Sequence, residues 1–178
     1  MRYNEAMQLP THFITGVLID QLIQRSTVPS RARPALIAAG CYLSHGLLDK
    51  LARATYHPPD PLHDPFWITY HKRILPLFTW FTALWFGPRH WFAMLWAALP
   101  DLDWVVRGLS ARFGWSIPGW NRPVLNESLH TALNHVPVVN RLNRLPDLRY
   151  DRRGALVEAG LVTFLLALVI LTRPPRHR

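Results

Sequence analysis

The sequence GCYLSHGLLD, residues 40–49, places a histidine and an aspartate four positions apart in an otherwise apolar run. On an α-helix this spacing brings His45 and Asp49 to one face, one turn apart. Burying such a pair among aliphatic side chains is costly unless the two groups are paired, hydrogen-bonded or bound to a metal ion. The rest of the chain must therefore supply partners for these two side chains.

The composition favours a membrane protein over a soluble one. Of the 178 residues, 49% are hydrophobic and only 17% are charged. Residues 155–172 contain one charge, Glu158, and as a helix would be about 27 Å long, close to the thickness of a bilayer core. Arginines flank this segment, and several of the eight tryptophans adjoin apolar runs, where they could act as interfacial anchors. We therefore expect membrane lipids to surround the chain.

The formal net charge of +9 raises the question of a nucleic-acid partner. The basic residues are spread along the chain, mostly between apolar segments, which favours arginines that fix membrane topology over a nucleic-acid-binding face. No nucleic acid is therefore expected. The single cysteine, Cys41, excludes an internal disulfide and a thiolate metal cluster. Residues 1–10 are polar, so insertion is expected to rely on an internal segment rather than on a cleavable signal peptide.

The hydrophobic pattern predicts an all-α fold, a small membrane helical bundle of about four to five apolar helices with a polar, arginine-rich loop region before the last transmembrane helix. One membrane-embedded domain is expected over residues 1–178. Its parts are a helical core at 11–106, a polar loop with a short helix at 107–153, and the C-terminal transmembrane helix at 155–172.

Within the core, residues 11–24 predict an amphipathic helix, with Thr11 or Asn4 as possible caps, and residues 35–52 predict a second helix. The apolar runs at 74–86 and 91–99 predict either a hairpin of short helices or one long helix kinked at a proline, and the hairpin is preferred.

From residue 105 onward the chain is poorly periodic up to the last helix, apart from a short helix capped by Asn126. If every apolar segment crosses the membrane, the N-terminus, the 50–73 loop and the 107–153 region share one face. They carry 13 Lys and Arg residues against 7 on the other face. The positive-inside rule then predicts a multi-pass protein with a cytoplasmic N-terminus.

Four groups of side chains could carry chemistry: His12; His45 with Asp49; Asp101 with Asp103; and His130 with His135. Imidazole nitrogens and carboxylate oxygens without thiolates suit a divalent metal such as Zn²⁺ or Mn²⁺. Two such ions could activate water and stabilise the attacking and leaving oxygens of a phosphoester.

A structural interpretation competes with the metal site. Asp49 could pair with an arginine, His45 could bond a backbone carbonyl, and the two later aspartates could cap the next turn. On a continuous helix His130 and His135 would be about 140° apart, so both could face one ion only if the helix bends or unwinds.

Residues 40–49 resemble the Tyr-Leu-Ser-His-x-x-x-Asp signature of small bacterial inner-membrane proteins described as metal-dependent hydrolases. A second motif of that family, Leu-Pro-Asp-x-Asp, is similar to Leu99-Pro100-Asp101-Leu102-Asp103. The spacing from His130 to His135 resembles the spacing of their paired histidines, and Thr11-His12 resembles their N-terminal histidine. That family is similar to the all-helical superfamily of zinc-dependent phospholipase C and P1 nuclease, in which His and Asp ligands from several helices hold zinc ions that hydrolyse phosphoesters.

The resemblance implies a ligand set of seven residues: His12, His45, Asp49, Asp101, Asp103, His130 and His135. It implies a zinc or manganese enzyme of the bacterial inner membrane that hydrolyses phosphoesters, with lipid head groups as one possible substrate. In such an enzyme Asp49 or Asp101 would help to hold an activated water. Trp104 stands where many relatives have a polar residue, and Thr131 and Asn134 replace the usual Arg and Thr. Losing groups that orient ligands lowers metal affinity or activity by roughly 10- to 100-fold. The sequence is therefore also compatible with a relative that binds metal but has lost catalytic turnover.

A second function of a different class fits the same sequence. The chain could be a non-catalytic structural or accessory subunit of a bacterial membrane protein complex, with its tryptophan-rich helices packed against lipids or partner subunits. Glu158, inside the last helix, would then make a polar contact with a partner helix. Convergence of the seven side chains in one pocket would favour the hydrolase, and dispersal over different faces would favour the subunit.

Overall fold

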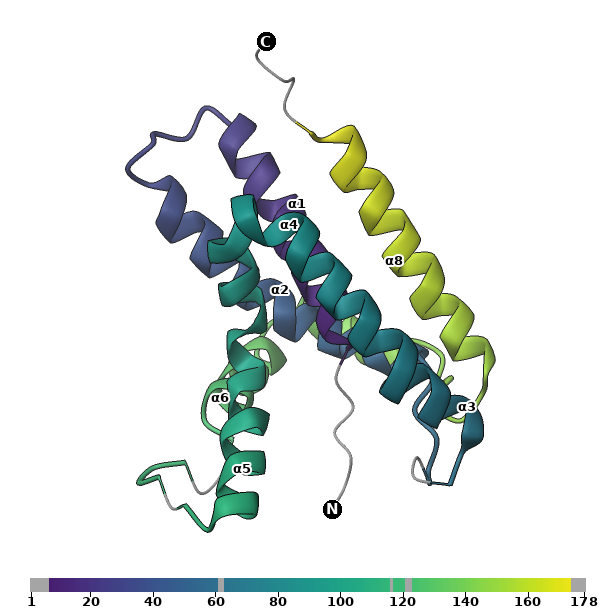
Figure 1. The fold of residues 1–178 in the computed structure, drawn as a ribbon. Helices are drawn as coiled ribbons and strands as arrows, with labels where there is room; N and C mark the ends of the chain where they lie inside the picture. Colours follow the sequence, from purple (N-terminus) through teal and green to yellow (C-terminus); the bar gives the residue numbers. More distant parts are fainter. Residues whose placement is uncertain (1–6, 61–62, 116, 121–122, 174–178) are drawn as a thin grey trace.

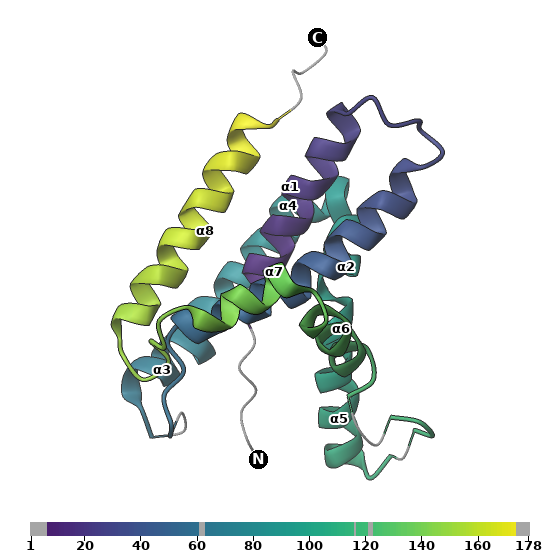
Figure 2. The same ribbon diagram turned by 180° about the vertical axis from the view of Figure 1, so that it is seen from behind.

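The computed structural model describes residues 7–60, 63–115, 117–120 and 123–173, and over these residues the chain is helical, with no strand. Figures 1 and 2 show the arrangement from opposite sides. The longer helices are α1 (Leu9–Arg25), α2 (Arg33–Leu51), α4 (Leu75–Ala98), α5 (Leu102–Phe113), α6 (Leu125–Asn134) and α8 (Arg153–Leu171). Shorter elements are η1 (Ala52–Ala54), α3 (Pro65–Thr69), the π-helical η2 (Tyr70–Ile74), η3 (Leu99–Asp101), α7 (Pro137–Asn140) and η4 (Arg141–Arg144). The expected all-α class is confirmed.

Helix α4 contains a sharp reversal at His90. The backbone of His90 has φ −123° and ψ 15°, outside the helical region, whereas the helix continues through Pro88. A proline inside a helix removes one backbone hydrogen bond and weakens the helix nearby, which explains a break so close to it. The His90 ring is held at the turn by Asp20, whose Oδ2 lies 2.6 Å from Nδ1. The two apolar runs thus form the preferred hairpin, with a turn shorter than the four residues expected.

The two arms of this hairpin both lie along α1. At the start of the first arm, Gln8 Nε2 contacts His71 Nε2 at 2.9 Å. After the turn the chain runs back along α1, and Ala93 and Ala97 pack against Gly16. Gly16 permits this close approach, since a Cβ atom there would lie 2.9 Å from the carbonyl oxygen of Ala93. The return arm thereby brings residues 99–103 back to the beginning of α1.

The apolar core lies where α1 meets both arms and α8. Seven buried side chains form its centre: Ile14, Val17, Leu18, Phe86, Met94, Leu165 and Val169. At the far end of α8, Thr172 Oγ1 donates a hydrogen bond to Gln21 Oε1 at 2.8 Å. Helices α1 and α8 therefore run side by side in the same direction (Figure 1).

Two sequence expectations beyond residue 100 are wrong. The chain was expected to be poorly periodic from residue 105 onward, but residues 105–113 belong to the amphipathic helix α5, which ends at Gly114 with φ 67°. Helix α6 begins at Leu125 after Val124 and not after an Asn126 cap. The amide of Asn126 is instead bound by a distant carboxylate, described below. Helix α5 extends away from the bundle of α1, α2, α4 and α8, whereas α6 packs against the C-terminal half of α2 (Figure 2).

One helix in the described part of the chain, α8, is long and apolar enough by itself to cross a membrane. Its mean hydropathy is 2.4 and only 22% of the 18-residue window is buried. Helix α4 also exposes large apolar side chains, including Leu77 and Leu84, each 72% exposed. Contiguous apolar surface of this kind is typical of an interaction face. The expected membrane bundle of about four to five apolar helices is therefore confirmed as helical but not as multi-spanning, because one described helix meets this criterion.

The contact at Gly16 predicts opposite effects for two glycine-to-alanine substitutions. Gly16→Ala should destabilise the bundle by roughly 1–3 kcal/mol, because the new methyl group would press on the backbone of Ala93. Gly160→Ala on α8 has no atom within 4 Å of the new Cβ and should gain about 0.5–1 kcal/mol of helix propensity. Thermal unfolding of the detergent-solubilised protein measures both. Equal midpoints for the two variants would contradict this packing.

Candidate metal centre

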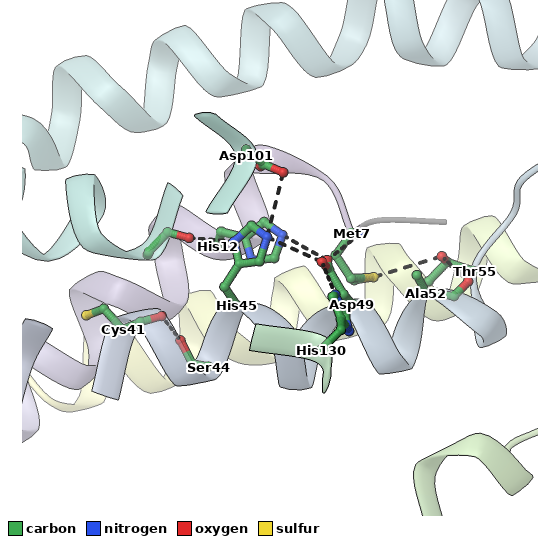
Figure 3. A network of polar contacts seen from close by, with 11 residues as sticks. Met7, His12, Cys41, Ser44, His45, Asp49, Ala52, Thr55, Asp101 and His130 are labelled. Atoms are coloured by element: carbon green, nitrogen blue, oxygen red, sulfur yellow. Dashed lines mark hydrogen bonds and ion pairs between the residues drawn. The ribbon is translucent and has the colours of Figure 1, made fainter. Parts of the chain in front are cut away.

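The His45–Asp49 pair lies in the C-terminal half of α2, on the face turned into the bundle (Figure 3). His45 is fully buried and Asp49 is 6% exposed. His45 Nε2 lies 3.3 Å from Asp49 Oδ2, as the four-residue spacing predicts for one helix face. The pair is therefore buried as expected, and its partners come from three other parts of the chain.

The first partner is His12, from the first turns of α1. Its ring stacks on the ring of His45, with centroids 3.8 Å apart and planes inclined by 12°. Its Nε2 lies 3.4 Å from Asp49 Oδ1. Within the described part of the chain, neither ring nitrogen of His12 makes an aligned hydrogen bond, although the side chain is fully buried. A buried imidazole with both nitrogens unsatisfied is unusual and indicates a missing partner.

The second partner is Asp101, carried to the site by the return arm of the α4 hairpin. Its Oδ1 lies 3.6 Å from His45 Nε2. Ligand-type atoms of His12, His45 and Asp101 all lie within 4.8 Å of one another, a spacing suited to one metal ion. Burial raises the pKa of the Asp101 carboxyl, while the nearby histidines oppose that increase. No local pattern near residue 101 could have predicted this contact, because it depends on the reversal at His90.

The third partner is His130, from α6. Its Nε2 lies 3.2 Å from Asp49 Oδ2. The Asp49 carboxylate thus faces three imidazoles and also accepts a hydrogen bond from the backbone N–H of Met7 at 3.0 Å. Sequence reasoning missed Met7, since a backbone donor leaves no signature in residue type. The structure thus surrounds the Asp49 carboxylate with three histidines and not with the arginine of the structural alternative.

The protonation of His45 defines the electrostatics of the site. Its Nδ1 lies 2.7 Å from the carbonyl oxygen of Ala97, which can only accept, so Nδ1 carries a proton. In the neutral imidazole Nε2 is then a bare lone pair, facing the carboxylates of Asp49 and Asp101 at 3.3 and 3.6 Å. Three electron-rich atoms meet there without a donor between them. A proton on His45 Nε2 or on the Asp101 carboxyl, or a metal ion among the three atoms, would relieve this repulsion.

Two of the seven expected ligands lie elsewhere. Asp103 is fully buried, but its Oδ1 accepts from Trp120 Nε1 at 2.5 Å and its Oδ2 from the Asn126 amide at 2.8 Å. It points away from the cluster because it follows Asp101 by two positions in a helical segment, about 200° around the axis. Its carboxylate instead fixes the start of α6. The structural alternative predicted that Asp103 would cap the next turn, whereas its carboxylate binds the amide of Asn126, 23 residues away.

His135 also lies outside the cluster. It ends α6, and its Nδ1 lies 2.8 Å from the carbonyl oxygen of Thr131 on an exposed surface. The helix does not unwind between His130 and His135, so the two rings face different directions. The structure therefore assembles five of the seven expected side chains: His12, His45, Asp49, Asp101 and His130.

The cluster is open on one side. The side chains of Asp101 and His130 are 24% and 26% exposed, whereas those of His12 and His45 are fully buried and that of Asp49 is 1% exposed. Asp101 belongs to η3 and His130 to α6, so the accessible edge lies where these two elements meet the bundle. Within the described part of the chain, Asp101 and His130 are therefore the cluster side chains that a small molecule could contact.

The chain matches no protein-family model, no curated protein sequence and no solved structure. The resemblance to metal-dependent hydrolases of the inner membrane therefore stays a prediction.

The position of Asp103 predicts a structural role that can be tested apart from metal binding. Asp103→Ala would leave the Trp120 and Asn126 donors without their acceptor, at a cost of roughly 1–3 kcal/mol each if they stay buried. We expect a clearly lower thermal midpoint and an unchanged metal-to-protein ratio in the folded variant.

Asp60→Ala is the matched control, because Asp60 is an exposed acid paired with His63. It should leave the thermal midpoint nearly unchanged. If elemental analysis shows that the folded Asp103→Ala protein has lost its bound metal, Asp103 must be counted among the metal ligands.

Proposed function

We propose that this chain is a membrane-bound, metal-dependent hydrolase of phosphoester substrates. The observation that carries the proposal is the convergence of His45 Nε2, His12 and two carboxylates around one point, where a metal ion would relieve the repulsion between their lone pairs. His12, His45 and Asp101 would hold the ion, and Asp49 would contribute an oxygen or orient both imidazoles. Nitrogen and oxygen donors without sulfur suit zinc, with manganese as a second possibility.

The donor set fits such an ion. The unsatisfied nitrogens of His12 supply lone pairs, and the Ala97 carbonyl fixes the tautomer of His45 that leaves Nε2 available. A divalent ion there would supply Lewis-acid chemistry, acidifying a water and neutralising charge that develops on a phosphoester.

Two side chains at the open edge could handle protons. His130 Nε2 is engaged by Asp49, so its Nδ1 is the nitrogen from which a proton could pass to a leaving group. The Asp101 carboxylate, which is 24% exposed at this edge, could accept a proton from the attacking water. The roles implied by the family resemblance, with Asp49 and Asp101 as catalytic carboxylates, are compatible with these positions.

A location in the bacterial inner membrane with several crossings is part of the proposal. Helices α1, α2 and α8 and both arms of α4 lie together, and the end of the bundle near Arg25 and Arg173 carries arginines. The opposite end leads into α5 and α6. If these helices and arms each cross the membrane, the chain alternates between its two sides. Of the 20 Lys and Arg residues, 13 then lie on the same side as the N-terminus, and the positive-inside rule makes that side cytoplasmic.

The level of the cluster along α8 bears on the substrate class. Met7, which bonds Asp49, packs in the same cluster as Leu161 of α8. Leu161 lies eight residues after Arg153, about 12 Å along a helix axis. If α8 spans the bilayer, this level lies within the hydrocarbon core, which is about 30 Å thick. A lipid phosphoester is held in the same phase as this part of the bundle, so lipids are the substrate class included in the proposal.

Two histidine substitutions test the metal centre. His45→Ala should abolish stoichiometric zinc and phosphoester hydrolysis together, since it removes the nitrogen that faces both carboxylates. His135→Ala, outside the cluster, should retain both. Elemental analysis of the purified proteins and a phosphate-release assay measure the outcome. Wild-type protein without bound metal would instead support the accessory-subunit alternative.

The substrate class is tested by comparing lipid and soluble phosphoesters. Phosphatidic acid in mixed micelles should be hydrolysed at least about tenfold faster than p-nitrophenyl phosphate at equal phosphoester concentration, because a bilayer-level site gains from substrate held in the same phase. Release of inorganic phosphate measures both reactions. Faster hydrolysis of the soluble ester would exclude a lipid-specific site while leaving the metal centre intact.

A further inference from the structure

Helix α5 (Leu102–Phe113) buries almost none of its surface against the described part of the chain. Asp103 is its only buried residue, and the carboxylate of Asp103 is bound by Trp120 and Asn126. A helix of 12 residues that contains a glycine, Gly108, is only marginally stable in water unless one of its faces is covered. The apolar face of α5 therefore needs a surface to cover it.

Four apolar side chains form a continuous stripe along α5: Leu102, Val105, Leu109 and Phe113. Helical geometry places them within an arc of about 80°, and Asp103 lies about 80–160° away from each of them. Each side chain of the stripe is between 38% and 54% exposed. Because Asp103 faces the start of α6, the stripe faces away from α6. Just beyond the helix, Trp115 stacks on Phe113 with ring centroids 5.2 Å apart, so the stripe ends in two exposed aromatic rings.

The charges left on the surface of α5 are positive. Arg107 and Arg112 each lie over an aromatic ring, at 5.2 and 5.7 Å from its centroid. Asp103, the only acidic residue of the helix, is buried, and residues 114–120 carry no charge. An apolar stripe with aromatic and arginine neighbours is typical of a helix that binds the interface of an anionic bilayer. Two copies of α5 packed face to face would instead bring like charges together.

The place of α5 in the fold brings it to the level of a bilayer surface. Helix α5 follows Asp101 of the cluster and extends toward the end of the molecule at which α8 begins (Figures 1 and 2). Its 12 residues span about 18 Å, more than the distance of about 12 Å along α8 between Leu161 and Arg153. If α8 spans the bilayer, the second half of α5 therefore reaches the head-group region.

We propose that α5 binds the lipid–water interface, with its stripe among the acyl chains and with Arg107 and Arg112 beside anionic head groups. The negative potential of such a surface attracts arginines over about a Debye length, roughly 8 Å at physiological ionic strength. This contact adds a helix that does not cross the membrane to the proposed membrane location. Because Asp101 directly precedes α5 and Asp103 fixes the start of α6, the contact also holds the open edge of the cluster next to lipid.

Spin labels on α5 test this contact in the full-length protein, reconstituted in phosphatidylcholine nanodiscs with about 30% phosphatidylglycerol as the anionic lipid. The native Cys41 is fully buried, so an added surface cysteine is labelled selectively. Leu109→Cys lies in the stripe. Ala111→Cys is the matched control, because Ala111 is exposed and about 200° further around the helix. Electron paramagnetic resonance measures collisions of each label with oxygen, which concentrates in lipid, and with a water-soluble nickel chelate.

The label at position 109 should lie about 5–10 Å below the head-group boundary, and the label at position 111 should be in water. High nickel access at both positions, or shielding of the label at position 109 from both reagents by protein, would overturn the proposal. A label at Phe164→Cys, on the exposed surface of α8, reports the bilayer separately. Lipid at position 164 with water at position 109 would overturn the α5 contact alone, whereas water at position 164 would overturn the membrane crossing of α8.

The role of charge is tested by removing either the anionic lipid or the arginines. In nanodiscs of phosphatidylcholine alone, nickel access at position 109 should rise by at least about threefold. The Arg107→Gln/Arg112→Gln variant should show the same rise in the anionic nanodiscs. Lys72→Gln is the matched control, since Lys72 is an exposed cation of η2 and should leave the access unchanged. Equal nickel access in the two lipid compositions would overturn the recognition of anionic head groups.

Discussion

The structure depends on the need to satisfy one buried carboxylate. Asp49 lies on α2 inside an apolar bundle, and three imidazoles and one backbone amide converge on its two oxygens. Each partner comes from a different part of the chain, so α1, the segment before it, and α6 must all reach α2 at one level. A buried charge that lost these contacts would be strongly destabilising. The same requirement that organises the fold therefore also assembles the candidate metal centre.

The α4 hairpin is the second constraint. Without the reversal at His90, Asp101 would lie at the far end of the bundle from His12. The small residues Gly16, Ala93 and Ala97 let the return arm approach α1 closely, and the His90–Asp20 contact holds the turn. Close backbone packing and a polar contact at the turn thus bring the last carboxylate to the two stacked histidines.

Local sequence patterns predicted part of the site and misplaced the rest. The helical spacing of His45 and Asp49 was sufficient to predict a shared face, and residue type was sufficient to mark His12, Asp101 and His130 as candidates. Asp103 and His135 have the same residue types at motif positions, yet the helical rotation from Asp101 and from His130 turns them away. The backbone groups of Met7 and Ala97 were missed because every residue carries an amide and a carbonyl.

The sequence by itself determined that the chain is all-helical, that its last helix is apolar enough to cross a membrane, and that His45 and Asp49 share a face. These properties follow from periodicity and composition within single helices, where neighbours along the chain are also neighbours in space. The tertiary structure alone decided which other side chains meet Asp49 and that α4 reverses at His90. The contacts with His12 and His130 join residues 37 and 81 positions apart, so they depend on how helices pack and not on any local pattern.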